Sequence, residues 1–257
     1  MRSKTIEFIG APGVGKSSIY KRLCEKWHPN QHWIYPEALL GGQKSPLARF
    51  KNWIDFSARQ ILHKKMRHTF PENGGLRYIQ ENEELAKFYW NHFHNSDFPA
   101  NKDISLRFRA IFYLYRDFCK HQAIQNAATD KLCILDEGLL QKSFLIHEDV
   151  KIIHDLLDEY LALLPLPRAI FWVDIADVGE IVKRIKNRQK IIASYIGEDD
   201  KGLFELSIRW RRLIELMAEK LQRYGVKVYE FDGEMTVDEN VEKIQKTIIS
   251  CTDDDRM

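Results

Sequence analysis

The feature that most constrains this chain is the segment Gly10 to Ser17, which reads GAPGVGKS and matches the phosphate-loop pattern GxxxxGK[ST]. Glycines at this spacing let the backbone curl until successive N–H groups face one anion. A helix that starts at the end of the loop adds the positive end of its dipole. The pattern therefore predicts a strand before the loop, a helix after it and a bound phosphate between them.

Both flanking segments fit this expectation. Thr5 to Ile9 is a short β-rich run, and Ile19, Tyr20 and Leu23 recur at helical spacing after the loop. We expect a nucleoside triphosphate here, with Mg-ATP favoured: Lys16 would reach the β- and γ-phosphates, and Ser17 would hold Mg²⁺. The residues predicted to contact the nucleotide are Gly10, Ala11, Pro12, Gly13, Val14, Gly15, Lys16, Ser17 and Ser18.

Further apolar runs predict the rest of a sheet. They are Trp33 to Tyr35, Leu132 to Leu135, Ala169 to Val173 and Val226 to Phe231. Strands that are apolar throughout and separated by helical segments indicate a parallel sheet covered on both faces. The chain is therefore predicted to have an α/β P-loop NTPase fold, with a central, mostly parallel five-stranded sheet flanked by helices and interrupted by an α-helical insertion.

The middle of the chain differs from its two ends. Residues 1–40 and 131–250 are predicted to form the P-loop core, whereas 41–130 shows only helical spacing and is predicted to be an acceptor-binding insertion. Within it, Ser45 to His68 is rich in Lys and Arg. An amphipathic helix with solvated cations is the favoured interpretation; the alternatives are binding to an anionic acceptor, foremost, or to a membrane surface or nucleic acid. Residues 251–257 are predicted to be a frayed tail.

Composition narrows the function classes. Lys plus Arg is 39 and Asp plus Glu is 37, so the net charge is +2, which argues neither for nor against nucleic acid. A small-molecule acceptor is the expected partner, and nucleic acid is not. The four cysteines form no CxxC pair, which favours reduced thiols. No apolar run is long enough for a signal segment or a membrane span. We expect a cytoplasmic protein, and its assembly is left open, with a homodimer among the possibilities.

Strand ends supply the candidate acids. Asp136 follows the apolar run Leu132 to Leu135, which is the Walker-B position, where a carboxylate holds Mg²⁺. Because the carboxyl ends of parallel strands meet at one edge, Asp136 should lie near Ser17, the other predicted metal-binding residue. Glu137 is ambiguous, since an acid at that position orients the attacking water in ATPases that hydrolyse.

Arg184 and Arg188 are four residues apart and so share one helix face. Two guanidinium groups on one face can clamp a transferring phosphoryl group. The alternative is a basic helix face that is merely solvated. Arg107, Arg109 and Arg116 are further candidates, for holding an anionic acceptor, and each could equally be a surface arginine.

Together these segments resemble the P-loop nucleoside and nucleotide kinases, which include thymidylate kinases and deoxynucleoside kinases. The resemblance rests on Gly10 to Ser17, Tyr35 to Glu37, Leu135 to Gly138 with Ser143, Pro167 to Asp174 with Arg184 and Arg188, and Val226 to Gly233. It covers residues 4–37 and 131–250. Glu137 stands where that family has an arginine, and the helical insertion matches nothing in it.

The resemblance implies an ATP-dependent kinase in which Lys16, Glu37, Asp136, Arg184 and Arg188 are catalytic. It implies that Glu37 is the general base for an acceptor hydroxyl. A surface glutamate is the alternative, and a phosphate acceptor would need no base.

The loop at Asp232 and Gly233 would contact the adenine by the same resemblance. The expected acceptor is a nucleoside, a nucleotide or another small metabolite. Two alternatives remain: the same chemistry on a sugar or polysaccharide precursor, and a non-kinase P-loop ATPase or regulatory nucleotide switch.

Overall fold

The computed structural model describes residues 4–39, 70, 72–94, 104–147, 151–188, 195 and 197–253. The strands are β1 (Thr5–Ile9), β2 (Trp33–Ile34), β3 (Leu132–Leu135), β4 (Ala169–Asp174) and β5 (Lys227–Asp232). The helices are α1 (Lys16–Glu25), α2 (Pro36–Leu39), α4 (Glu72–Glu81), α5 (Glu83–His94), α6 (Ile104–Gln125), a 3₁₀ helix (Ser143–His147), α7 (Ile153–Leu163), α8 (Val178–Lys186), α9 (Asp200–Arg223) and α10 (Val237–Asp253).

The strands form one five-stranded sheet in the order β2-β3-β1-β4-β5, and every neighbouring pair is parallel. This confirms the predicted α/β fold. In register, Ile6 on β1 lies between Ile134 on β3 and Ala169 on β4. Because β1 is central, the loop that follows it emerges between the carboxyl ends of β3 and β4, where ligands bind in open α/β sheets.

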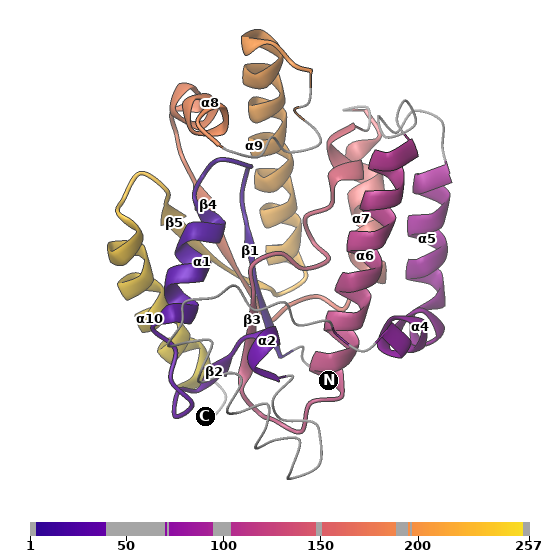
Figure 1. Cartoon of the computed structure of the whole chain (residues 1–257), viewed down its shortest axis with the longest axis vertical. Coiled ribbons are helices and arrows are strands. Elements are labelled where there is room, and N and C mark those ends of the chain that lie inside the picture. The colour runs from indigo at the N-terminus through magenta and orange to yellow at the C-terminus, as the bar shows by residue number, and fades with distance from the viewer. Residues whose placement is uncertain are drawn as a thin grey trace.

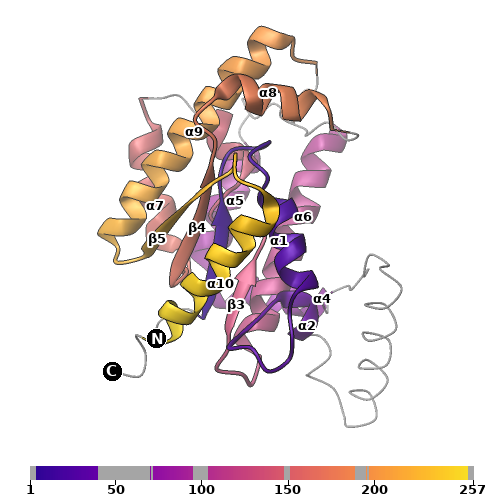
Figure 2. The ribbon, with the colours of Figure 1, turned by 90° about the vertical axis from the view of Figure 1, so that its left-hand side faces the viewer.

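Helices cover both faces of the sheet. α1 and α10 lie together on one face, and α5, α6 and α7 lie on the other (Figure 1, Figure 2). Every residue of β1 and β3 is buried, which explains why these strands read as nearly continuous apolar runs. Glu7, in the middle of β1, is the exception: it is a carboxylate with 1 % of its surface exposed.

The connection from β2 to β3 passes through α4, α5 and α6, and α4 packs along α6. These helices fall within the segment predicted as an insertion, whose limits at 41 and 130 stay a prediction. The basic segment Ser45 to His68 lies outside the described residues. α6 leads through a short turn into β3, so its cavity-facing side chains are held close to the edge of the sheet.

The tail boundary predicted at residue 251 needs correction, because α10 continues to Asp253. Cys251 is fully buried, and its thiol lies 3.3 Å from the hydroxyl oxygen of Tyr229 on β5. Packing against the sheet therefore extends the helix past the point where its charged sequence suggested fraying. No helix in the described ranges has the length and apolar character that a membrane span requires.

Candidate functional site

The phosphate loop has the backbone conformation that its glycines predicted. Gly13 and Gly15 both have φ of 102°, in the left-handed region that favours glycine. Gly15 immediately precedes α1, and its carbonyl oxygen accepts hydrogen bonds from the N–H groups of Ser18 and Ile19. The loop therefore ends at a helix N-terminus, as an anion site of this type requires.

Lys16 is the buried cation of the loop, with 6 % of its surface exposed. Its Nζ donates to the carbonyl oxygens of Gly10 at 2.5 Å and Ala11 at 3.1 Å. Burial lowers the pKa of the Lys16 ammonium, and the carboxylates of Glu137 and Asp136 oppose that shift. Lys16 is thus a desolvated positive charge beside two acids, at the start of α1.

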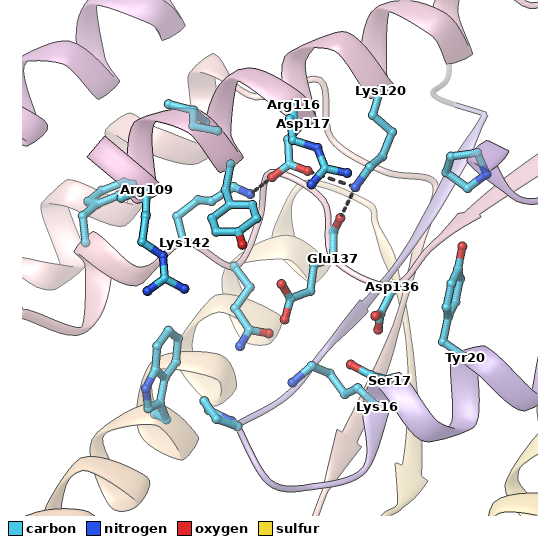
Figure 3. A pocket seen from close by; sticks show the side chains of 18 of the residues that line it. Lys16, Ser17, Tyr20, Arg109, Arg116, Asp117, Lys120, Asp136, Glu137 and Lys142 are labelled. Atoms are coloured by element: carbon cyan, nitrogen blue, oxygen red, sulfur yellow. Dashed lines mark hydrogen bonds and ion pairs between the residues drawn. The ribbon is translucent and has the colours of Figure 1, made fainter. Parts of the chain in front are cut away.

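Asp136 directly follows β3 and faces Ser17 across the loop (Figure 3). Burial, followed by the charge of Glu137, raises the pKa of Asp136 to about 6, and Lys16 and a hydrogen bond from Ser17 limit the rise. The Oδ1 atom of Asp136 is buried and has no hydrogen-bond partner within the described part of the chain. An unsatisfied carboxylate oxygen beside a hydroxyl fits Mg²⁺, which prefers oxygen ligands.

A cavity of about 630 Å³ opens in front of the loop. Most of the predicted catalytic residues line it: Lys16, Glu37, Asp136 and Arg188, together with Ser17. These come from α1, α2, the end of β3 and the segment after α8, so the fold brings together positions spread over most of the chain. Whether they act in catalysis stays a prediction.

Arg184 is separated from this group. It lines a neighbouring cavity of about 440 Å³ together with Gly233, and this cavity shares Arg188 with the first. The Nε of Arg184 donates to Glu180 Oε1 at 2.9 Å, and its Nη1 donates to the Gly233 carbonyl oxygen at 2.9 Å. Arg184 and Arg188 are therefore not equivalent, although sequence spacing placed them on one face.

In the loop after β5, the side chain of Asp232 binds the loop's own backbone. Asp232 lies outside the lining of both cavities, and its Oδ1 accepts from the backbone N–H of Glu234 at 2.8 Å. The neighbouring cavity is lined instead by Gly233 and the residues up to Val237, together with Val14 of the phosphate loop and Ser18 of α1. Gly233, but not Asp232, is therefore positioned to touch a nucleotide held by the loop.

Glu37 lies in the first turn of α2, immediately after Pro36, and is half-buried in the wall of the larger cavity. Its carboxylate is near enough to Lys120 to help raise the pKa of that lysine. Glu37 therefore lines the same cavity as the phosphate loop, within range of the charge on Lys120.

An ionic cluster on the cavity wall opposite the phosphate loop was not predicted from the sequence. Asp117 Oδ1 accepts from Lys120 Nζ at 2.9 Å, and Asp117 Oδ2 accepts from Lys142 Nζ (Figure 3). Lys120 also donates to the Glu137 carbonyl oxygen at 3.1 Å. Burial raises the pKa of Asp117, but the charges of Lys142 and Lys120 lower it overall. No local spacing joins Asp117 to Lys142, so only the folded chain shows the cluster.

Arg109 and Arg116 line the same wall, as the sequence suggested for an anionic acceptor, whereas Arg107 lies outside both linings. Two further cavity residues carried no recognised signal. Gln141 accepts from the Gly10 N–H at 3.1 Å and donates to the Gly10 carbonyl oxygen at 2.8 Å. Trp210 is 4 % exposed, and its indole N–H has no partner among the described residues.

Glu7 lies beneath the segment that follows Asp136. Its Oε2 accepts from the Leu140 N–H at 3.2 Å, and its Oε1 lies 4.0 Å from His121 Nε2. Burial raises the pKa of Glu7 to about 7 and lowers the pKa of His121 to about 3. A Cβ added at Gly138 would lie 2.1 Å from the Glu7 carboxyl carbon, which explains a glycine at that position.

Comparison with known proteins yields fold-level similarity only. No protein-family model and no curated protein matches the chain. Two solved structures of deoxyadenosine kinase from M. mycoides are similar in architecture, each at 15 % sequence identity. The one with products dCMP and a flexible dCDP bound has a TM-score of 0.47 and covers 96 % of this chain and 99 % of its own. The one with bound dATP has a TM-score of 0.45 and covers 95 % and 98 %.

Proposed function

We propose that this chain is an ATP-dependent phosphotransferase that moves the γ-phosphoryl group of ATP to a small-molecule acceptor. One observation carries the proposal: the phosphate loop lines one side of a cavity of about 630 Å³ whose far wall carries its own polar and aromatic side chains. Hydrolysis requires room for a water molecule only. A cavity of this size beside the phosphate site suits a second substrate.

Roles follow from position. The nucleotide's phosphates would lie on the loop, with its nucleoside part in the neighbouring cavity beside Gly233. Lys16 and Arg188 would face the transferring group, where their charges stabilise the negative charge of the transition state. Mg²⁺, held by Ser17 and Asp136, would neutralise phosphate charge as a Lewis acid. Glu37 would accept the proton of an acceptor hydroxyl while the hydroxyl oxygen forms the new bond to the γ-phosphorus and the bond from phosphorus to ADP breaks.

The acceptor is proposed to be nucleoside- or nucleotide-like. Phe93 and Phe144 are nearly fully buried in the cavity wall, with Tyr113 and Trp210 nearby, and aromatic walls suit a planar ring. A sugar or polysaccharide precursor is the alternative acceptor for the same chemistry.

A hydrolysing ATPase or nucleotide switch is the second candidate, and Glu137 is the observation that favours it. Its charge acts on Lys16 more strongly than that of Asp136, so its carboxylate faces the phosphate site (Figure 3). An acid in this place can orient an attacking water.

A screen of phosphoryl acceptors with ADP release as the readout separates the two. We expect ADP release to depend on one acceptor class and the product mass to increase by one phosphoryl group. Glu137→Gln should leave most acceptor-dependent turnover intact. ADP release that is equally fast without any acceptor, and is lost in Glu137→Gln, would identify a hydrolase.

A further inference from the structure

The cavity wall opposite the phosphate loop is cationic. Arg109, Arg116 and Lys120 project from α6, and Lys142 joins them from the segment after β3; these four residues are called the cationic wall (Figure 3). The first three lie at i, i+7 and i+11 of one helix, so they share a face and extend over about 16 Å of its length. The wall therefore runs along the cavity instead of meeting it at a single point.

Part of this charge is desolvated. The Lys120 and Lys142 side chains are 19 % and 15 % exposed, and the Asp117 carboxylate that they share is 14 % exposed. Two ammonium groups on one carboxylate leave one positive charge over. The charges of Glu37 and Glu137 also reach Lys120, so a further anion beside the cluster would be held mainly by Lys142.

Arg109 and Arg116 have no ion-pair partner among the residues that the structure describes. Arg116 only lies over the Phe112 ring, with Cζ 6.0 Å from the centroid. Arg211, by contrast, forms a bidentate pair with Asp174. No described residue pairs with the guanidinium donors of Arg109 and Arg116 in the cavity, and their fork geometry suits the oxygens of a phosphate.

The excess charge lies on the acceptor half of the cavity. Among the lining residues that the structure describes, the cationic wall sets four cations against the two carboxylates of Asp117 and Glu37. On the phosphate-loop half, Lys16 and Arg188 are matched by Asp136 and Glu137. Mg-ATP occupying the loop half would therefore leave two positive charges unmatched on the other side.

We infer that the acceptor carries an anionic group of its own, a phosphomonoester, which Arg109 and Arg116 bind with Lys142. A phosphomonoester dianion matches the excess of two charges, whereas a neutral nucleoside or sugar would leave it in place. The inference rests on the proposed function because it concerns the acceptor half of the same site.

Binding to the MgADP-saturated protein tests the subsite without turnover. The probes are the four common 2′-deoxynucleosides and ribose, each with its 5′-monophosphate, and thymidine 5′-carboxylate as the carboxylate probe. We expect at least one 5′-monophosphate to bind about 100-fold more tightly than its neutral partner, the gain of two charge-assisted contacts. Equal affinity across every pair overturns the inference, and tighter binding of the carboxylate than of thymidine 5′-monophosphate overturns the phosphomonoester assignment.

Variants test whether the arginines of the cationic wall cause the preference for the monophosphate. Arg109→Gln and Arg116→Gln should each weaken monophosphate binding about 10-fold, without changing nucleoside or MgADP binding. Arg212→Gln is the matched control, an exposed arginine on α9 outside both cavities. A double variant that keeps the monophosphate preference overturns the inference. Acceptor-independent ADP release by the wild type would overturn the kinase proposal instead, while the binding comparison still decides the subsite.

Discussion

The two halves of the cavity are built differently. The phosphate-loop half comes from one contiguous run, Gly10 to Ser17, whose backbone forms the anion site and whose lysine is 6 % exposed. The acceptor half is assembled from α2, α6 and the segment after β3, and its contacts are long side chains. Backbone N–H groups cannot change with a substitution, whereas side chains can.

From this difference we infer which half of the cavity determines substrate specificity. On the proposed function, the loop half would hold the phosphates of a nucleoside triphosphate mainly through backbone N–H groups, whatever its side chains are. The acceptor half depends on Asp117 bringing Lys120 and Lys142 together from different elements. We therefore expect substitutions on the loop half to stop the chemistry, and those on the acceptor half to change which molecule is used.

The largest expected effect is on the loop half. Lys16→Ala should reduce acceptor-dependent ADP release by more than about 10³-fold, because the transferring group loses a preorganised, desolvated cation. Binding of a monophosphate to the cationic wall should be unchanged. Lys21→Ala, at a lysine on α1 that is 79 % exposed, is the control. Undiminished turnover by a folded Lys16→Ala protein would contradict the proposed site.

Arg188 and Arg184 test whether the two cavities differ in role. Arg188→Ala should lower kcat by about 10³-fold, by analogy with arginine fingers. Arg184→Ala should mainly raise the KM for ATP, because Arg184 is held by Glu180 and the Gly233 carbonyl oxygen beside the neighbouring cavity. Steady-state kinetics with varied ATP distinguish the two. Identical kinetic changes would show that both arginines act as one clamp.

Glu37 tests the acceptor half. Glu37→Gln keeps the shape and removes the basicity, so transfer to a hydroxyl should slow by about 10²-fold while ATP affinity stays the same. Single-turnover rates measure this directly, with Glu25→Gln on α1 as the control. An unchanged rate would exclude Glu37 as the general base, and is the result required if a phosphate oxygen is the attacking atom.

A substitution at Gly138 tests how tightly the segment after β3 packs against Glu7 on β1. Gly138→Ala would place a methyl group 2.3 Å from both Glu7 carboxylate oxygens, and we expect a loss of about 1–3 kcal/mol in the free energy of unfolding. Gly74→Ala on α4, where a Cβ meets its nearest neighbour at 3.7 Å, is the control and should not destabilise. Urea unfolding measures both. Equal stability of the two variants would show that the segment moves away from β1 at little cost.

The smallest expected effect is a change in how stability depends on pH. The pKa of Glu7 is raised to about 7, so its contribution is complete below pH 4.5 and is lost as the pH rises through 7. The pKa of His121 is lowered to about 3, so its contribution is complete above pH 6.5 and is lost as the pH falls. Between pH 4.5 and 6.5 the two contributions oppose each other.

Glu7→Gln removes one of these opposing contributions. The free energy of unfolding of the variant should then fall as the pH is lowered from 6.5, by up to about 1.4 kcal/mol per pH unit more than in the wild type. Urea midpoints at a series of pH values measure the difference. Parallel pH profiles for the variant and the wild type would show that the buried pair does not titrate as its surroundings imply.

Much of the phosphate-loop half was predictable from local sequence. The loop pattern, the helix after it and the buried strand ending at Asp136 are each contained within a few residues. Strand type and number followed from the same information, because strands buried on both faces read as apolar runs. The predicted five-stranded parallel sheet was confirmed.

The acceptor half and the limits of α10 required the tertiary structure. Sequence spacing placed Arg184 and Arg188 on one helix face and predicted a frayed tail from residue 251, whereas α8 ends at Lys186, before Arg188, and α10 continues past the buried Cys251.

Most importantly, α6 mixes basic, acidic and aromatic residues around its circumference, so periodicity alone cannot tell which of its charges face a cavity. That depends on the rotation of the helix, which packing against α4 sets. The local sequence therefore determined the proposed nucleotide site, where backbone N–H groups would form the contacts. The tertiary structure decided the acceptor site, because its charges come from separate elements and meet only after those elements pack.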